Sequence, residues 1–242
     1  MYKKVAALGL VFMATTACSL IGDPSGRKQT GTHPLKPGTE WVATSQDWVD
    51  EAKAVYSDAS AYVTHVSKQT PVDAWVVILD VDETVLNNVE YQISRDIIGQ
   101  GYTRESWFAW TQKEEATLVP GAADFIRLVN ELGGHVALVT NRQDVEQLAT
   151  EKNLAALGLR RHHDFRVLLT RASPEGASSK DQRFALVTTM LAAQGYPNAR
   201  AVAFVGDNKK DKPALLQDAK FFCIDQGAMY GDPCAKVPRT GV

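Results

Sequence analysis

The chain has 242 residues, with 26 Lys and Arg against 28 Asp and Glu, 45% hydrophobic residues and 3 Cys. This composition excludes a disordered chain, which carries less apolar surface, and a disulfide-rich scaffold. A formal charge of −2 gives no basic surface for duplex DNA, so we expect no nucleic-acid partner. An anionic substrate must therefore be held by a few well-placed cations.

The first residues follow the pattern of an export signal. Lys3 and Lys4 precede 13 uncharged residues, 5–17, which are too few to span a bilayer, and Cys18 follows them. The stretch before Cys18 resembles the lipobox of bacterial lipoproteins, although Thr15 stands where Leu is usual, so ordinary signal-peptidase cleavage stays open. We expect residues 1–17 to be a signal peptide. The exported protein is then an outer-membrane lipoprotein lipidated at Cys18, with that lipid as its only membrane contact, or a periplasmic protein.

A segment rich in glycine and proline follows the signal. Residues 22–38 contain four Gly and three Pro without periodic apolar positions. Such a composition is typical of a flexible linker. We therefore expect a tether over residues 18–43 and one folded domain over residues 44–242.

Helices and strands alternate along the expected domain. Thr44 or Ser45 can cap a first helix, whose apolar residues recur at three- and four-residue spacing from Trp48 to Val66. Apolar runs predict strands over 75–79, 136–139, 165–169, 201–205 and 221–224, and amphipathic stretches predict helices over about 120–132, 145–157 and 180–194. This alternation predicts an α/β fold with a parallel central sheet covered by helices on both faces.

Polar residues follow three of the predicted strands, where ligands bind in open α/β sheets. They are Asp80 to Thr84, Thr140 to Arg142, and Gly206 to Asp211. If the strands are neighbours, Asp80 and Asp207 converge, and their like charges call for a hard dication such as Mg²⁺. We expect the chain to bend after the strand so that Asp80 and Asp82 are both directed at one substrate. A nucleophile and a separate proton donor need that arrangement.

Four motifs in this order resemble those of the haloacid-dehalogenase (HAD) superfamily. They are Asp80-x-Asp82-x-Thr84, Thr140, Lys180 ahead of a helix, and Gly206-Asp207-x-x-x-Asp211. The class C acid phosphatases of HAD subfamily IIIB are secreted or lipoprotein bacterial enzymes, and some of them act as 5′-nucleotidases. A longer set of residues in this chain is similar to their motifs. It comprises Ile78 to Asn88, Tyr91, Trp107-x-x-Trp110, Pro120-Gly121, Val139 to Arg142, Ser179-Lys180-x-x-Arg183-Phe184 and Val205 to Asn208.

The resemblance covers about residues 75–222 and implies a HAD-like Rossmannoid three-layer sandwich. The implied activity is broad-specificity hydrolysis of small phosphate monoesters, including nucleoside 5′-monophosphates. Asp80 would form an aspartyl-phosphate, and Asp82 would protonate the leaving oxygen and then activate water. The implied cofactor is Mg²⁺, held by the Asp80 carboxylate, the main-chain carbonyl of Asp82, and Asp207.

Further roles are implied for three polar residues. Thr140 and Lys180 would bind phosphoryl oxygens, because a hydroxyl and an ammonium suit the charge that those oxygens carry. Asp211 would orient either a metal-bound water or Lys180. Phosphoryl transfer by the same site, or a catalytically silent lipoprotein that binds phosphate or nucleotide, are the alternatives.

An aromatic segment of about 30 residues, 88–119, is inserted between the first strand and Pro120. It is too short for a full cap domain, which favours an open site. Trp107 and Trp110 share a helix face, and whether they form a small core or stack on substrate stays open. The resemblance favours at least one aromatic residue in the leaving-group pocket, with Tyr91, Trp110 and Tyr230 as candidates.

Two further cysteines, Cys223 and Cys234, flank Tyr230. In an oxidising compartment they can pair and close a loop around this tyrosine. Two free thiols, with Cys223 buried in a strand, are the alternative. The sequence sets no oligomeric state.

Overall fold

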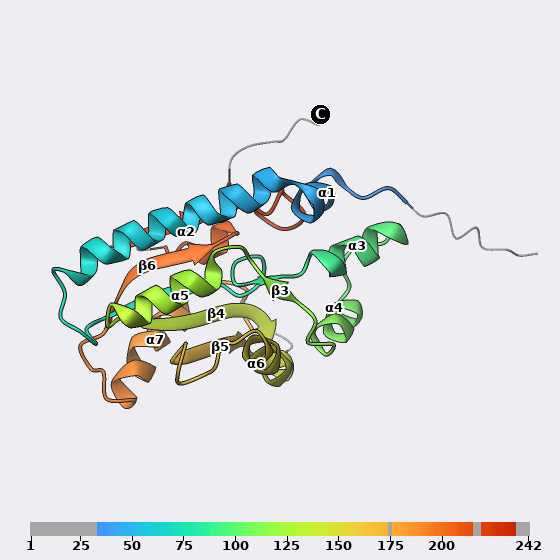
Figure 1. Ribbon diagram of the computed structural model, residues 1–242. Coiled ribbons are helices and arrows are strands. Elements are labelled where there is room, and N and C mark those ends of the chain that lie inside the picture. Colours follow the sequence, from blue (N-terminus) through green and yellow to red (C-terminus); the bar gives the residue numbers. More distant parts are fainter. Residues whose placement is uncertain (1–32, 174–175, 215–218, 236–242) are drawn as a thin grey trace, which may run out of the picture. The chain divides into compact units, whose positions relative to one another are not determined.

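The structure is a computed structural model that describes residues 33–173, 176–214 and 219–235 (Figure 1). The expected signal peptide, Cys18 and most of the expected tether lie outside these residues. Within the described part of the chain, no helix combines the length and apolar character that crossing a membrane requires.

The described residues form alternating helices and strands, as the sequence predicts. In chain order they are α1 (Pro37–Thr44), α2 (Gln46–Ser67), β1 (Trp75–Leu79), β2 (Leu86–Asn87), α3 (Val89–Ile97), α4 (Arg104–Thr111), β3 (Thr117–Leu118), α5 (Ala122–Glu131), β4 (His135–Gln143), η1 (Asp144–Glu146), α6 (Gln147–Ala156), β5 (Val167–Arg171), α7 (Asp181–Ala193), β6 (Arg200–Gly206), η2 (Lys209–Asp211) and β7 (Lys220–Cys223).

The central sheet has five strands in the order β5-β4-β1-β6-β7, and every neighbouring pair is parallel. β1 lies in the middle, and all five of its residues are buried. Its side chains alternate between two hydrophobic clusters, one containing Val77 and Leu79 and the other Val76 and Ile78. Helices α2 and α5 cover one face and α7 the other (Figure 1). The three-layer α/β prediction is confirmed.

The long helix α2 begins where the sequence predicts. The Ser45 side chain accepts a hydrogen bond from the main-chain N–H of Asp47 at 3.1 Å and so caps the helix. The buried residues of the helix recur at three- and four-residue steps and form one face: Trp48, Ala52, Tyr56, Ala59 and Val63.

The folded region begins earlier than the expected boundary at residue 44. Residues 37–44 form α1, with Pro37 at the first turn, where a missing N–H costs nothing. Thr39 and Val42 of this helix are buried. Just before it, the main-chain N–H of Lys36 donates to Asp96 Oδ2 of α3 at 2.9 Å. The tether prediction is therefore wrong for residues 37–43, because these residues pack on the insertion.

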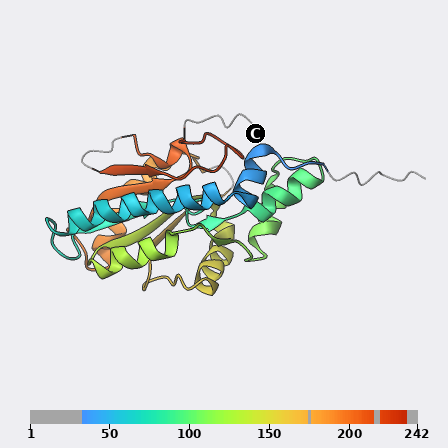
Figure 2. The same cartoon turned by 45° about the horizontal axis from the view of Figure 1, so that its top comes forward.

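The insertion forms a small unit of its own. Strands β2 and β3 pair antiparallel at its base, with Leu86 opposite Leu118, and α3 and α4 lie between them in the sequence. Both views place these helices beyond the ends of the central strands (Figures 1 and 2). The insertion thus lies beside the edge of the sheet where the polar residues gather.

Candidate active site

The chain turns sharply after β1, at the polar sequence that begins with Asp80. The Leu86 N–H donates to the Val81 carbonyl at 2.8 Å, and Glu83 at the tip has a φ of 54°, a conformation that costs a non-glycine residue some free energy. As a result, Asp80 and Asp82 both line one cavity of about 150 Å³. The predicted bend is present.

One ammonium lies among the carboxylates of this cavity. Lys180, the residue before α7, is buried, and its Nζ donates to Asp80 Oδ1 and, at 2.6 Å, to Asp211 Oδ1. The second oxygen of Asp211 accepts the main-chain N–H of Asn208 at 2.8 Å. Both oxygens of Asp211 are therefore engaged, and this residue orients Lys180.

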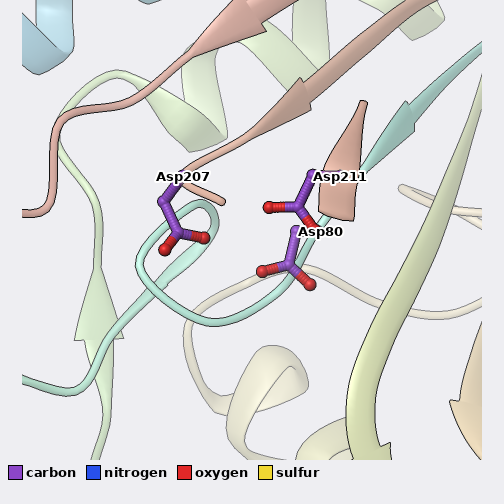
Figure 3. A group of neighbouring side chains, drawn as sticks. All are labelled: Asp80, Asp207 and Asp211. Atoms are coloured by element: carbon purple, nitrogen blue, oxygen red, sulfur yellow. The ribbon is translucent and has the colours of Figure 1, made fainter. Parts of the chain in front are cut away.

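Three buried carboxylates converge in the cavity. Oxygen atoms of Asp80, Asp207 and Asp211 lie within 4.8 Å of one another (Figure 3). Burial raises the pKa of Asp80, the Lys180 ammonium opposes this, and the Asp211 and Asp82 carboxylates raise it further, to about 7. Burial, with Asp211 and Asp80, also raises the pKa of Asp207 well above its usual range. One ammonium does not balance these charges, and the all-oxygen donor set fits a hard dication.

Asp82 is held by a network of its own. Its Oδ1 forms an ion pair with Nη2 of Arg142 at 2.8 Å and accepts Arg142 Nε at 2.9 Å. The same oxygen accepts Asn88 Nδ2 at 3.0 Å. The hydroxyl of Thr140 lies 3.3 Å from Oδ2. Asp82 therefore has a fixed orientation that differs from that of the Asp80 carboxylate beside Lys180.

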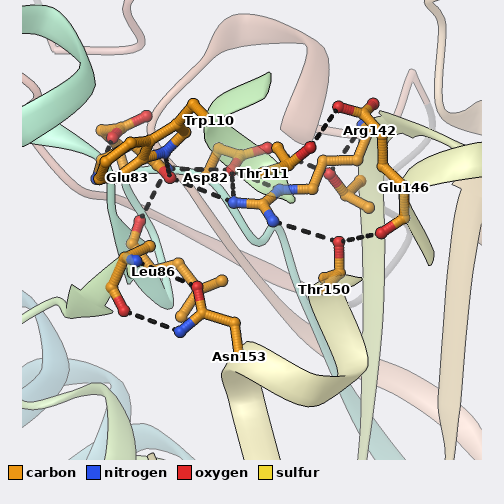
Figure 4. A network of polar contacts seen from close by, with 12 residues as sticks. Asp82, Glu83, Leu86, Trp110, Thr111, Arg142, Glu146, Thr150 and Asn153 are labelled. Carbon is orange, nitrogen blue, oxygen red and sulfur yellow. Dashed lines mark hydrogen bonds and ion pairs between the residues drawn. The ribbon is translucent and has the colours of Figure 1, made fainter. Parts of the chain in front are cut away.

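The Asp82 network reaches the insertion and α6 (Figure 4). Arg142 Nη1 donates to the hydroxyl of Thr150 at 3.1 Å. Glu146 accepts the Thr111 hydroxyl of α4 at 3.0 Å and the Gln143 main-chain N–H at 2.7 Å. The insertion is thus joined to β4 by buried hydrogen bonds, which fix its place beside the site.

Asp207 contacts the segment that follows β7. Gln226 is buried, and its Nε2 donates both to Asp207 Oδ2 at 3.1 Å and to the Tyr230 carbonyl at 2.8 Å. Cys234 N–H donates to the Asp207 carbonyl at 2.9 Å. Cys234 is also joined to Cys223 by a disulfide with a Cα–Cα distance of 5.9 Å. The pairing that the sequence left open is present and closes the loop around Tyr230.

The predicted site residues do not all occupy the cavity wall. Asp80, Asp82, Lys180, Asp207, Asp211 and Tyr230 line the cavity, together with Asn141, Asn208 and Lys210. Thr140 is fully buried beside Asp82, and its role in phosphate binding stays a prediction.

Two of the proposed substrate-lining aromatics lie in the core. Tyr91 is 2% exposed, packs edge-on against Trp107 at 4.9 Å between ring centroids, and has its hydroxyl 2.9 Å from Ser106 Oγ. Trp110 is 8% exposed, and its Nε1 donates to Asn88 Oδ1 at 2.9 Å. Neither ring lines the cavity, so this expectation is corrected for both. Their polar atoms are bonded inside the insertion, which is where their apolar surface is buried.

Sequence reasoning assigned no role to Arg142, Asn88 or Gln226. Arg142 and Asn88 belong to the motifs quoted above. Both contact Asp82, from which they lie 60 and 6 residues away along the chain, respectively. Strand alternation offered one signal, because Arg142 lies two residues after Thr140 and so on the same face of the sheet. No signal pointed to Gln226.

Comparisons with known proteins agree with the geometry. Residues 29–232 match the family described as HAD superfamily, subfamily IIIB (acid phosphatase). The class C acid phosphatase from Bacillus anthracis has a similar structure, with a TM-score of 0.67, 24% identity, and coverage of 80% of this chain and 84% of that chain. The same enzyme with tungstate bound gives a TM-score of 0.66 at 23% identity, with the same coverage.

Proposed function

Because the chain belongs to the acid phosphatases of HAD subfamily IIIB and is a HAD-type phosphomonoesterase, we propose that Asp80 is its nucleophile and Mg²⁺ its cofactor. The observation that carries this proposal is the convergence of three buried carboxylates and the Lys180 ammonium in one cavity, with Asp82 at its side. The proposed substrates are small phosphate monoesters, including nucleoside 5′-monophosphates.

The reaction has two steps. An oxygen of Asp80 attacks phosphorus in line, the bond from phosphorus to the leaving oxygen breaks, and protonated Asp82 gives its proton to that oxygen. Water then attacks the aspartyl-phosphate, Asp82 takes the proton back, and phosphate leaves. Lys180 binds the equatorial oxygens, where the charge lies during transfer. The separate hydrogen-bond partners of Asp80 and Asp82 support separate roles for the two carboxyls.

The residues that would hold the metal are Asp80, Asp207 and the main-chain carbonyl of Asp82. A bound dication neutralises the negative charge of the phosphoryl group and of the carboxylates around it. The raised pKa of Asp207 and its buried position support a site that is built for a positive charge. Asp211 stays with Lys180, which holds the ammonium in place for phosphate.

The test is phosphate release from p-nitrophenyl phosphate and 5′-AMP, first with Mg²⁺ and then with excess chelator. We expect activity that chelator abolishes and Mg²⁺ restores. Asp80→Asn should lower kcat by at least about 10³-fold, since it removes the attacking carboxylate.

The matched control is Asp124→Asn, because the Asp124 side chain is 81% exposed and does not line the cavity around Asp80. Unchanged turnover by the Asp80→Asn protein would falsify the mechanism. No turnover by the native protein would favour a silent phosphate-binding protein, and transfer of phosphate to added alcohols without hydrolysis would favour a phosphotransferase.

We further propose that the protein works outside the cytoplasm, through residues 1–17 as a signal and Cys18 as a lipid anchor. The Cys223–Cys234 disulfide supports an oxidising compartment. The intact mass of the membrane-bound protein checks this: a mature chain that starts at Cys18 and carries acyl groups is expected. An unprocessed N-terminus would contradict export, and an unmodified mature chain would contradict lipidation.

A further inference from the structure

The wall of the phosphate cavity has more acidic than basic side chains. Four aspartates line it: Asp80, Asp82, Asp207 and Asp211. Within the described part of the chain, the cations that line it are Lys180 and Lys210. A phosphate monoester adds a charge of about −1.5 to −2 at pH 7. Binding such a substrate therefore depends on what each of the two ammonium groups is free to contact.

The Lys180 ammonium is already engaged by carboxylates. An ammonium has three N–H donors, and Lys180 uses one for Asp80 Oδ1 and one for Asp211 Oδ1. Its side chain is buried, so its charge lies between these two carboxylates with little water around it. Lys180 therefore has one donor left for a phosphoryl oxygen and little uncompensated charge to attract a dianion.

The Lys210 ammonium, in contrast, has no carboxylate partner among the described residues. Its Nζ lies 3.4 Å from the hydroxyl of Ser178, which is a long hydrogen bond. Ser178 precedes α7, and its carbonyl accepts Nδ2 of Asn141, another residue of the cavity wall, at 3.1 Å. The Lys210 side chain thus extends along the cavity from η2 to the segment before α7, and its charge is free to bind an anion.

The backbone that carries Lys210 is held in place by its neighbours. The Asn208 side chain caps η2 and accepts the main-chain N–H of Lys210 at 3.1 Å. The main-chain N–H of Lys209 donates to the Asp232 carbonyl at 2.8 Å, in the loop that the disulfide closes. Only the side chain of Lys210 then has to be ordered when an anion binds, which limits the entropy cost of the contact.

Building on the proposed function, we propose that Lys210 binds the phosphoryl group of the substrate, and later the phosphate product, as a second ammonium beside Lys180. Lys180 is buried and contacts oxygens at the floor of the cavity, whereas Lys210 is exposed and contacts an oxygen at its open side. The contact is present before, during and after transfer. It therefore strengthens binding more than it accelerates the chemical step.

Lys210→Met tests this contact, and Lys209→Met is the matched control. Lys209 is the neighbouring exposed lysine of η2, carries the same charge and does not line the cavity. Calorimetric titration of inorganic phosphate into the protein with Mg²⁺ present gives an affinity that does not depend on turnover. We expect Lys210→Met to weaken phosphate binding about tenfold, because a hydrogen bond from a charged donor is lost.

The kinetics of p-nitrophenyl phosphate hydrolysis give a second readout. Lys210→Met should raise KM about tenfold and leave kcat within about twofold of the native value, as expected for a contact that persists through the reaction. Lys210→Arg keeps the charge and should stay within about threefold of the native phosphate affinity. Lys209→Met should match the native protein in both measurements.

Salt separates a direct contact from long-range attraction. Attraction alone would be lost equally in the two methionine variants and would vanish in about 0.5 M NaCl, where surface charges are screened within a few ångströms. That result would overturn the proposal, as would native phosphate affinity in Lys210→Met.

Failure of this contact is distinguishable from failure of the proposed function. Hydrolysis by the native protein together with unchanged phosphate affinity in Lys210→Met refutes only the contact. Phosphate binding that depends on Lys210, without hydrolysis of the ester, refutes only the proposed function. If the native protein neither binds phosphate nor hydrolyses the ester, both are refuted.

Discussion

A single residue, Arg142, links the proposed proton donor to the rest of the protein. Its guanidinium binds Asp82 through two nitrogens, and Nη2 also donates to Asn88 Oδ1 at 3.1 Å. The side chain is fully buried, so this arrangement is shielded from water and holds Asp82 in one direction. Lysine at this position would keep the charge but lose the planar, forked geometry.

We therefore predict that Arg142→Lys affects poor leaving groups most. An alkyl ester needs a proton on the departing oxygen, whereas p-nitrophenolate leaves readily without one. The kcat for glycerol 2-phosphate should fall about tenfold more than the kcat for p-nitrophenyl phosphate. Arg127→Lys, whose side chain is 64% exposed on α5, is the control. Equal losses on both esters would mean that Arg142 supports only the fold.

At the scale of elements, the five strands of the central sheet were predictable, whereas helix α1 and the helices and strands of the insertion were not. The apolar runs of β1 and β6 end just before Asp80 and Asp207, so the hydrophobic pattern predicted that each carboxylate lies at the carboxyl end of a strand. Helix α1 was missed because a helix of eight residues with two buried positions carries too little periodicity to outweigh its Pro and Gly. Its packing against α3 comes from tertiary contact, which no local pattern contains.

The site shows the same division between local and distant contacts. Asp80 and Asp207 follow from their places at strand ends, and Lys180 follows from the resemblance to the HAD motifs. The burial of Trp110 did not follow, since spacing identifies a shared helix face but not what covers that face. The role of Asn88 did not follow from the sequence either. Its side-chain oxygen accepts hydrogen bonds from Trp110 and Arg142, which lie on two other elements.

The disulfide after β7 should affect both the stability of the protein and its affinity for Mg²⁺. The Cys223–Cys234 disulfide closes the loop that holds Gln226 and Tyr230 against Asp207. Replacing both cysteines with serine should lower the free energy of unfolding by about 3 kcal/mol, measured by urea denaturation. Mg²⁺ affinity should fall as well, because Asp207 loses its anchored partners. Unchanged stability and affinity would show that the hydrogen bonds suffice without the covalent link.

For the whole molecule, the buried carboxylates predict how stability depends on pH. Burial raises the pKa of Asp80 to about 7 with help from Asp211 and Asp82, and burial with Asp82 raises that of Glu83 to about 8. Their unfolded-state pKa values lie near 4, so between about pH 4 and 8 the native state binds more protons than the unfolded state. Stability of the metal-free protein should therefore fall as pH rises through this window.

Thermal unfolding measures this effect directly. With chelator present, the Tm should be higher at pH 5 than at pH 8, and Mg²⁺ should raise the Tm most at pH 8, where the carboxylates are ionised. Asp207→Asn should flatten the pH dependence of the metal-free protein, since it removes one of the buried charges. A metal-free Tm that rises from pH 5 to pH 8 would show that the cluster is already compensated.

The placement of the site across distant parts of the chain also has a consequence for biosynthesis. Asp80 and Lys180 are 100 residues apart, and Asp211 comes later still. A growing chain therefore carries the proposed nucleophile, Asp80, long before the ammonium and the carboxylate that position it have been made. Since β6 must also dock beside β1 to bring Asp207 into place, no N-terminal fragment contains a site, and catalysis begins only once nearly the whole domain has emerged and folded.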